Sequence, residues 1–148
     1  MLKWNSFKKR IGFSLVCVLT SFVNFAQVVT TNPPFPTEGD AITITFDASQ
    51  GNQGLKGFTG DIFAHTGVVT DKTIATNGWN YVQGQWGTSN APKLTNVGAD
   101  KYELKIDNIR SFYGVLPADE VLRIAILFRN EAGDKAGRAA DGSDIFID

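Results

Sequence analysis

Apolar and polar side chains alternate along much of the chain, and this pattern predicts β-strands. In 41–48, AITITFDA, isoleucine and phenylalanine alternate with threonine and aspartate. A period of two residues is typical of a strand with one buried face. The same period in 101–107, KYELKID, predicts a second strand, and a turn at 98–100 joins it to 93–98 as a hairpin.

The run VLRIAILFRN, 121–130, is the most apolar stretch that follows Ala26. Both of its faces carry apolar side chains, which predicts a strand in the middle of a sheet. Less regular strands are predicted at 61–66, 79–83 and 144–148. In the first of these, DIFAHT, the period of two places Phe63 and His65 on the same face.

The segments between these strands are rich in turn-forming residues. Three prolines in 27–40 exclude a helix there and predict an extended lead-in at a sheet edge. Asn108 is a candidate N-cap for one short helical turn over 109–114. Loops are predicted at 49–60, 66–78 and 130–144.

Together these elements predict an all-β fold. About seven to eight short strands, with little helix and polar loops between them, are typical of an antiparallel β-sandwich of immunoglobulin-like type. The domain is expected to span 41–148, after the lead-in at 27–40. Because the last predicted strand runs up to Asp148, we expect the module to continue or to be followed by further domains.

The N-terminus has the organisation of a secretory signal peptide. Its first ten residues carry four basic side chains and no acid, and an apolar run then ends at Ala26. We therefore expect a signal peptide at 1–26, cleavage after Ala26, and a protein that is secreted or held at the cell surface. A membrane anchor fits less well, because the apolar run is shorter than the ~20 residues that span a bilayer. A lipoprotein acylated at Cys17 also fits less well, because Val16 is bulky where such signals need a small residue.

Removal of 1–26 changes the charge balance of the chain. All 15 acidic residues follow Ala26, whereas four of the 14 lysines and arginines precede it, so the exported part has a net charge of about −5. Scattered basic residues on an acidic chain provide no electrostatic site for nucleic acid. The only cysteine, Cys17, is also removed, which excludes disulfides, a thiol nucleophile and a thiolate metal site in the exported part.

The stretch 61–87 concentrates side chains that suit a sugar ligand. It contains the only histidine, His65, and two of the three tryptophans, Trp79 and Trp86, with Tyr81 between them and several amide side chains nearby. Flat aromatic faces pack against the C–H faces of sugar rings. Amide and imidazole groups can then form hydrogen bonds with the sugar hydroxyls.

Each of these residues also has a structural interpretation. Trp79 and Tyr81 stand two residues apart on one predicted strand face, so either can belong to the core. His65 shares a face with Phe63, which favours a partly buried histidine that is hydrogen-bonded to a neighbour. Trp86, between a glutamine and a glycine in a predicted loop, is expected to be exposed.

The sequence contains no motif of an enzyme or a metal site. One histidine excludes a multi-histidine metal centre, and the chain has no GxSxG, no HExxH and no glycine-rich phosphate loop. None of the 15 acids stands on a recognisable glycosidase motif. We therefore predict no catalytic residues, no cofactor and no metal in this segment. For Asp134, Asp141 and Asp144 a solvated turn is favoured over a calcium site, because their spacing lacks the alternation of an EF-hand loop.

Four segments carry a family resemblance, in this order: DIFAHTGVVTDK, GWNYVQGQWG, KLTNVGADKYELKI and VLRIAILFRNEAGDKAGRAADGSDIFI. Over 38–148 the chain resembles the starch-binding carbohydrate-binding modules of bacterial amylases, and still more the N-terminal sandwich domains of secreted amylase-family proteins from Bacteroidetes. The resemblance implies a glucan platform of His65, Trp79 and Trp86, with Asn130 near the binding end of the sandwich. One departure is KAGRAA, 135–140, where starch-binding members usually have tryptophan and asparagines.

Three hypotheses on function follow. The first is a non-catalytic carbohydrate-binding module of a secreted glycoside hydrolase, which binds α-glucan through His65, Trp79, Tyr81 and Trp86. The second is a structural domain that packs on a neighbouring catalytic domain or partner and binds no sugar. The third is an adhesin-like module that recognises protein. Exposure of Trp86 favours the first hypothesis, and burial of Trp86 favours the second.

Overall fold

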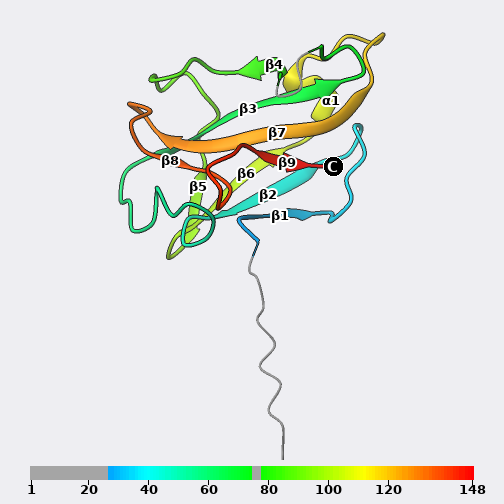
Figure 1. The fold of residues 1–148 in the computed structure, drawn as a ribbon. Coiled ribbons are helices and arrows are strands. Elements are labelled where there is room, and N and C mark those ends of the chain that lie inside the picture. Colours follow the sequence, from blue (N-terminus) through cyan, green and yellow to red (C-terminus); the bar gives the residue numbers. More distant parts are fainter. Residues whose placement is uncertain (1–26, 75–77) are drawn as a thin grey trace, which may run out of the picture.

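The computed structural model describes residues 27–74 and 78–148, and the predicted signal peptide lies outside them. The described residues form two antiparallel sheets and one short helix (Figure 1). The predicted antiparallel β-sandwich is therefore confirmed. The described part of the chain has nine strands where the sequence predicts about seven to eight.

The first sheet contains four strands in the order β1, β2, β6, β5. Their bounds are Val29–Asn32 for β1, Ile42–Asp47 for β2, Lys101–Ile106 for β6 and Thr95–Gly98 for β5. β1 lies at the sheet edge, as the proline-rich lead-in predicts, and β5 and β6 form the predicted hairpin. The two strands with the most regular alternation, β2 and β6, lie side by side in the middle of the sheet.

The second sheet is built around β7, Val121–Asn130, the longest strand of the described residues. β3, Ile62–Thr70, pairs with one edge of β7 and also with β4, Asn80–Gln83. Two short strands, β8 (Ala136–Gly137) and β9 (Ile145–Ile147), share the other edge of β7. The central position predicted from the apolar run of β7 is confirmed.

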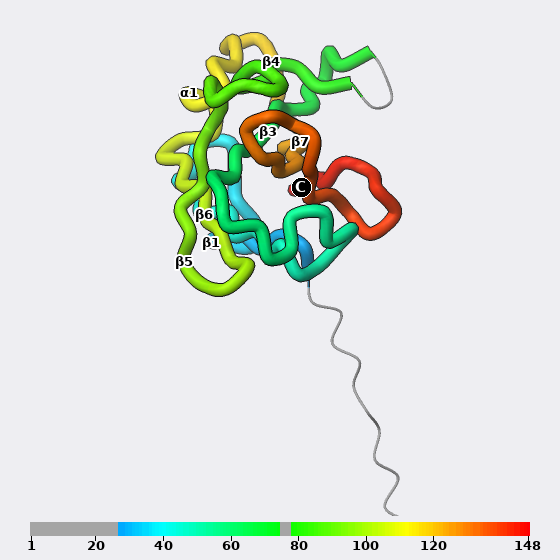
Figure 2. The backbone as a smooth tube through the Cα atoms, turned by 90° about the vertical axis from the view of Figure 1, so that its left-hand side faces the viewer, coloured from blue at the N-terminus to red at the C-terminus, as the bar shows by residue number. Residues whose placement is uncertain are grey.

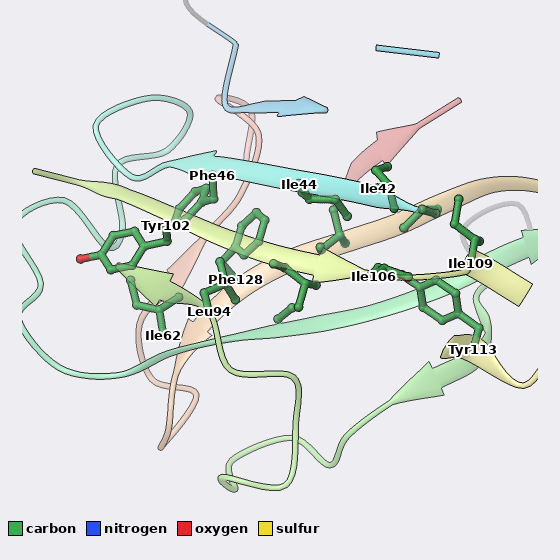
Figure 3. Packing of buried hydrophobic residues seen from close by; sticks show 14 of the residues in the cluster. Ile42, Ile44, Phe46, Ile62, Leu94, Tyr102, Ile106, Ile109, Tyr113 and Phe128 are labelled. Carbon is green, nitrogen blue, oxygen red and sulfur yellow. The ribbon is translucent and has the colours of Figure 1, made fainter. Parts of the chain in front are cut away.

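Figure 2 shows the sandwich from one side as two layers, with β5 and β6 in one layer and β3 and β7 in the other. The core lies between the layers and contains the apolar side chains of the alternating pattern. Phe46 of β2 and Phe128 of β7 stack across it with ring centroids 4.0 Å apart. Figure 3 shows both rings close to Tyr102 of β6, within the cluster of buried residues. Burial of this apolar surface stabilises the fold.

β3 extends into a stretch that the sequence predicts as a polar loop. The prediction of a loop over 66–78 is wrong from Thr66 to Thr70, where β3 continues. The buried Thr66 hydroxyl donates to the Ala125 carbonyl at 2.9 Å and shares a hydrogen bond of 2.8 Å with the Tyr113 hydroxyl. Threonine is tolerated in the core here because its polar atom is fully hydrogen-bonded. β8 likewise lies inside a region that the sequence predicts as a turn.

The one helix of the described residues, α1 (Ile109–Tyr113), starts where the sequence predicts. The Asn108 side chain accepts a hydrogen bond of 2.9 Å from the Ser111 backbone N–H, which satisfies one of the free donors at the helix start. Gly114 ends the helix in the left-handed conformation, with φ of 70°. Within the described residues, no helix combines the length and the apolar character that a membrane span requires.

Candidate functional site

The outer face of the second sheet carries the side chains of β3 and β7 that point away from the core. Phe63 is paired with Arg129, and His65 is paired with Leu127. Paired residues of adjacent strands share a face, so these four side chains form one patch. His65 is half-buried and the other three are buried, which shows that other segments cover this face.

The cover comes from the residues around β4 and from the connection between β8 and β9, which projects beyond the second sheet in Figure 2. It leaves a hollow of about 550 Å³, named here the aromatic hollow. The hollow is lined by His65, Trp79, Val82, Trp86, Leu127, Arg138 and Asp144. Three of the predicted site residues, His65 and the two tryptophans, therefore come together in one place.

Both tryptophan rings lie against the His65 ring. The ring centroids of His65 and Trp79 are 5.4 Å apart with planes inclined by 37°, and those of His65 and Trp86 are 5.2 Å apart with planes at 88°. The two indole planes are therefore inclined to each other by at least about 50°, the difference between 88° and 37°. Trp86 is 43% exposed, as expected from the sequence, and Trp79 is half-buried. The rings form an angled apolar surface, not a flat one.

Arg129 holds the loop that carries Trp86. Its Nη2 donates to the carbonyls of Gln85 and Thr88, on both sides of Trp86, at 2.8 and 2.9 Å. Its Nη1 donates at 3.0 Å to two carbonyls at the end of β7 and in the turn that follows. The guanidinium carbon lies 5.6 Å from the Trp86 ring centroid and 5.7 Å from that of Phe63. Backbone carbonyls and two aromatic rings thus surround the guanidinium charge of Arg129.

Sequence reasoning misses this role of Arg129. An arginine on the outer side of a strand is usually exposed, yet Arg129 is 0% exposed. Burial lowers the pKa of Arg129, because a guanidinium loses hydration in the interior. The only sign in the sequence is a basic residue at the end of an apolar strand. The loop that carries Trp86 buries Arg129, and Arg129 in turn holds this loop through the Gln85 and Thr88 carbonyls.

An ion pair forms the polar rim of the aromatic hollow. Arg138 follows β8 and Asp144 precedes β9, and Nη1 of Arg138 is bonded to Oδ1 of Asp144. Their side chains are 29% and 25% exposed. The rim presents N–H donors and a carboxylate acceptor to a ligand that carries hydroxyl groups. The sequence does not identify either residue as a binding residue, because they reach His65 only through the folding of the β8–β9 connection.

The surroundings of His65 favour its neutral form. Burial lowers its pKa, the charges of Arg129 and Arg138 lower it further, and Asp144 acts in the opposite direction. The buried Nδ1 has no hydrogen-bond partner among the described residues, so the predicted bond from a neighbour is not found at this atom. A neutral imidazole has one donor and one acceptor nitrogen, which suits an uncharged hydroxyl ligand.

Trp79 lines the aromatic hollow and Tyr81 does not. The predicted strand at 79–83 begins at Asn80, so Trp79 lies just before it and does not share a strand face with Tyr81. The pairing of β4 with β3 contains an irregularity in which three residue steps of β4 match two of β3. Tyr81 lies there with φ of 55°, and its ring packs against the core while its hydroxyl donates to Asp119 at 2.5 Å. The extra residue reverses the alternation, and Val82 faces the hollow in place of Tyr81.

Asn130 shapes a turn beside Trp86 and does not line the aromatic hollow. Its Oδ1 accepts hydrogen bonds of 3.0 and 3.1 Å from the backbone N–H groups of Gly133 and Lys135, and its Nδ2 donates to Asp134. Gly133 has φ of 75°, and a Cβ at this position would come within 2.5 Å of the Trp86 Nε1. Asn130 therefore contributes to the site indirectly, because it holds the turn at Gly133 against which the Trp86 ring packs.

The three aspartates considered for calcium have separate partners. Asp134, Asp141 and Asp144 bond, in that order, to Asn130, Ser143 and Arg138. In the part of the chain that the structure describes, no group of three or more His, Cys, Asp or Glu side chains is arranged to hold a metal ion. Asp134 and Asp141 are exposed, which fits the predicted solvated turn, and Asp144 is half-buried.

Comparison with known proteins does not identify the chain: no protein-family model matches it, and no curated protein matches it significantly. The resemblance to starch-binding modules therefore stays a prediction.

Proposed function

We propose that this domain is a non-catalytic carbohydrate-binding module and that it binds an α-linked glucan in the aromatic hollow. The observation that carries the proposal is the placement of Trp79 and Trp86 against His65 in one open hollow with an ion pair at its rim. A sugar has apolar C–H faces and a polar hydroxyl edge, and this arrangement matches both. In the same proposal the module is exported and serves a glycoside hydrolase domain further along the chain.

The angle between the indole planes favours an α-linked chain. Consecutive glucose units of an α-1,4-glucan turn relative to one another and the chain curves, whereas a β-1,4-linked chain is an extended ribbon. Coplanar rings suit a ribbon, while planes inclined by at least about 50° suit neighbouring units of a curved chain. With one sugar ring on each indole, two glucose units occupy the aromatic hollow.

Exposure and charge favour binding over packing and over cleavage. Trp86 is 43% exposed, and a ligand that covers this ring removes apolar surface from water. The lining of the aromatic hollow contains one carboxylate, that of Asp144, and it is paired with Arg138. Glycoside hydrolysis ordinarily uses two carboxylates, so the hollow suits retention of a glucan. Because the hollow is open to solvent, we expect weak affinity.

The test is a titration of tryptophan fluorescence in the purified protein with maltoheptaose, with soluble starch and with cello-oligosaccharides. A saturable change with the α-glucans alone supports the proposal and places a tryptophan at the site. No change with any glucan, together with unretarded migration in a starch-containing gel, contradicts it. Trp86→Ala should reduce the fluorescence change and shift it to about tenfold higher maltoheptaose concentrations or more.

A second candidate is a structural domain that packs on a neighbouring domain or partner. A groove of about 640 Å³ lies along β1 and β9, and Phe35 in it is 87% exposed. Ile145, Phe146 and Ile147 line the same groove, and a contiguous apolar patch of this kind is typical of a surface that another protein covers. Phe35→Asp should then release the neighbouring domain and leave the glucan titration unchanged, whereas an unchanged association contradicts this second candidate.

A further inference from the structure

A second, smaller hollow adjoins the aromatic hollow. It has a volume of about 200 Å³ and is lined by Arg138, Ser143, Asp144 and Phe146. Arg138 and Asp144 line both hollows, so their ion pair stands between the two.

Strand register places both hollows on the same face of the second sheet. His65 of β3 is paired with Leu127 of β7, and Ala125, two residues along β7, is paired with Phe146 of β9. Residues that are paired, or two apart on one strand, share a face. The Phe146 ring therefore belongs to the outer face, on the opposite side of β7 from His65.

The second hollow resembles the aromatic hollow in its chemistry. Phe146 is half-buried, and the guanidinium carbon of Arg123 lies 4.3 Å from its ring centroid, which holds the ring in position. The Ser143 hydroxyl donates to Asp141 at 2.6 Å and keeps its capacity to accept a hydrogen bond. An aromatic ring, a hydroxyl and the shared ion pair are again the groups that a sugar unit needs.

We propose that the second hollow is a further sugar subsite, so that one glucan crosses the Arg138–Asp144 pair and contacts both the tryptophans and Phe146. This inference rests on the proposed function. It specifies the ligand as an unbranched α-glucan of at least three units, because two units occupy the indoles and the next reaches Phe146. Arg138 and Asp144 then form hydrogen bonds with hydroxyls of the second and third units, which lie on either side of the ion pair.

The test compares the wild type with Phe146→Leu by calorimetric titration with maltose, maltotriose and maltoheptaose. Leucine keeps much of the apolar volume and removes the ring. We expect wild-type affinity to rise from maltose to maltoheptaose. Phe146→Leu should weaken maltoheptaose binding by about three- to tenfold and leave maltose binding unchanged, because maltose fills only the aromatic hollow.

Two further variants make the test specific. Phe35→Leu is the matched control, because Phe35 is 87% exposed and lines neither hollow, and it should bind all three sugars as the wild type does. Ser143→Leu fills the second hollow from an exposed position and should show the same length-dependent loss as Phe146→Leu. It keeps the test informative if Phe146→Leu fails to fold.

The outcomes separate this inference from the proposed function. If Phe146→Leu and Ser143→Leu lose no affinity, or lose as much for maltose as for maltoheptaose, the second subsite is overturned while wild-type binding still supports the aromatic hollow. If the wild type binds none of the three sugars, both proposals are overturned. Trp86→Ala provides the contrast, because it should weaken binding of all three sugars.

Discussion

The inner and outer faces of the second sheet are stabilised by different contacts, although the same strands supply both. On the inner face, apolar side chains pack against the first sheet, as in the stack of Phe128 on Phe46 at 4.0 Å. On the outer face, aromatic rings pack around Arg129, whose hydrogen bonds go to loop carbonyls. The inner face depends on complementary side-chain volumes, and the outer face depends on loop conformation. Damage to the outer face should therefore disturb binding more than folding.

The largest expected effect is on the inner face. Phe128 is 0% exposed, and Phe128→Ala should lower the free energy of unfolding by about 3 to 5 kcal/mol, because it leaves a cavity between the sheets. Chemical denaturation measures this change. Phe35→Ala, at a position 87% exposed, is the matched control and should change stability by less than about 0.5 kcal/mol. A loss at Phe128 no larger than that of the control would contradict the packing described.

Replacement of Arg129 tests whether the outer face depends on loop conformation. Arg129→Met removes four hydrogen bonds to backbone carbonyls and should lower the free energy of unfolding by about 2 kcal/mol. Release of the Trp86 loop should also shift tryptophan emission to the red and increase its quenching by acrylamide. Arg129→Lys should give a smaller change, since an ammonium cannot reproduce the planar fork. Unchanged emission in Arg129→Met would show that this arginine does not hold the loop.

Trp86→Ala should affect the outer face alone. We expect affinity for maltoheptaose to fall by about tenfold or more, because one of the two stacking rings is lost. Stability should change by less than about 1 kcal/mol, since the ring is 43% exposed. Tyr81→Phe is the control on the neighbouring strand, because Tyr81 lies outside the aromatic hollow, and its affinity should equal that of the wild type. Equal losses of affinity in the two variants would indicate a general disturbance of β4 and the loop after it, and not the loss of a stacking ring.

The smallest expected effect is a pH dependence. The pKa of His65 in the folded protein lies below its ordinary value of 6.5, chiefly because of burial. The folded state thus favours the neutral imidazole. Above about pH 6.5 the imidazole is neutral in both the folded and the unfolded chain, whereas below it the unfolded chain takes up the proton first and the free energy of unfolding falls. Wild-type stability and glucan affinity should therefore decline more steeply below about pH 6.5 than those of His65→Gln. Denaturation and titration at several pH values measure this, and parallel profiles would contradict it.

Elements with a strict local pattern were predictable from the sequence. The strands β2, β6 and β7 follow from alternation or from an apolar run, and α1 follows from the cap at Asn108. The β4 irregularity was not predictable, because φ of 55° at Tyr81 is uncommon for a residue of this type and leaves no local sign. For the same reason the sequence did not indicate that Tyr81 lies outside the aromatic hollow.

The sequence by itself determined the sandwich and the concentration of His65, Trp79 and Trp86 in one stretch, since strand periodicity and composition are local properties. Only the tertiary structure decided that Arg129 lies buried beneath the Trp86 loop and that the Arg138–Asp144 pair borders the same hollow. The physical reason is that these contacts depend on the register of β7 with β3 and β9, and on carbonyls in distant loops. The alternation of apolar and polar residues within a strand specifies neither the register between strands nor the position of distant loops.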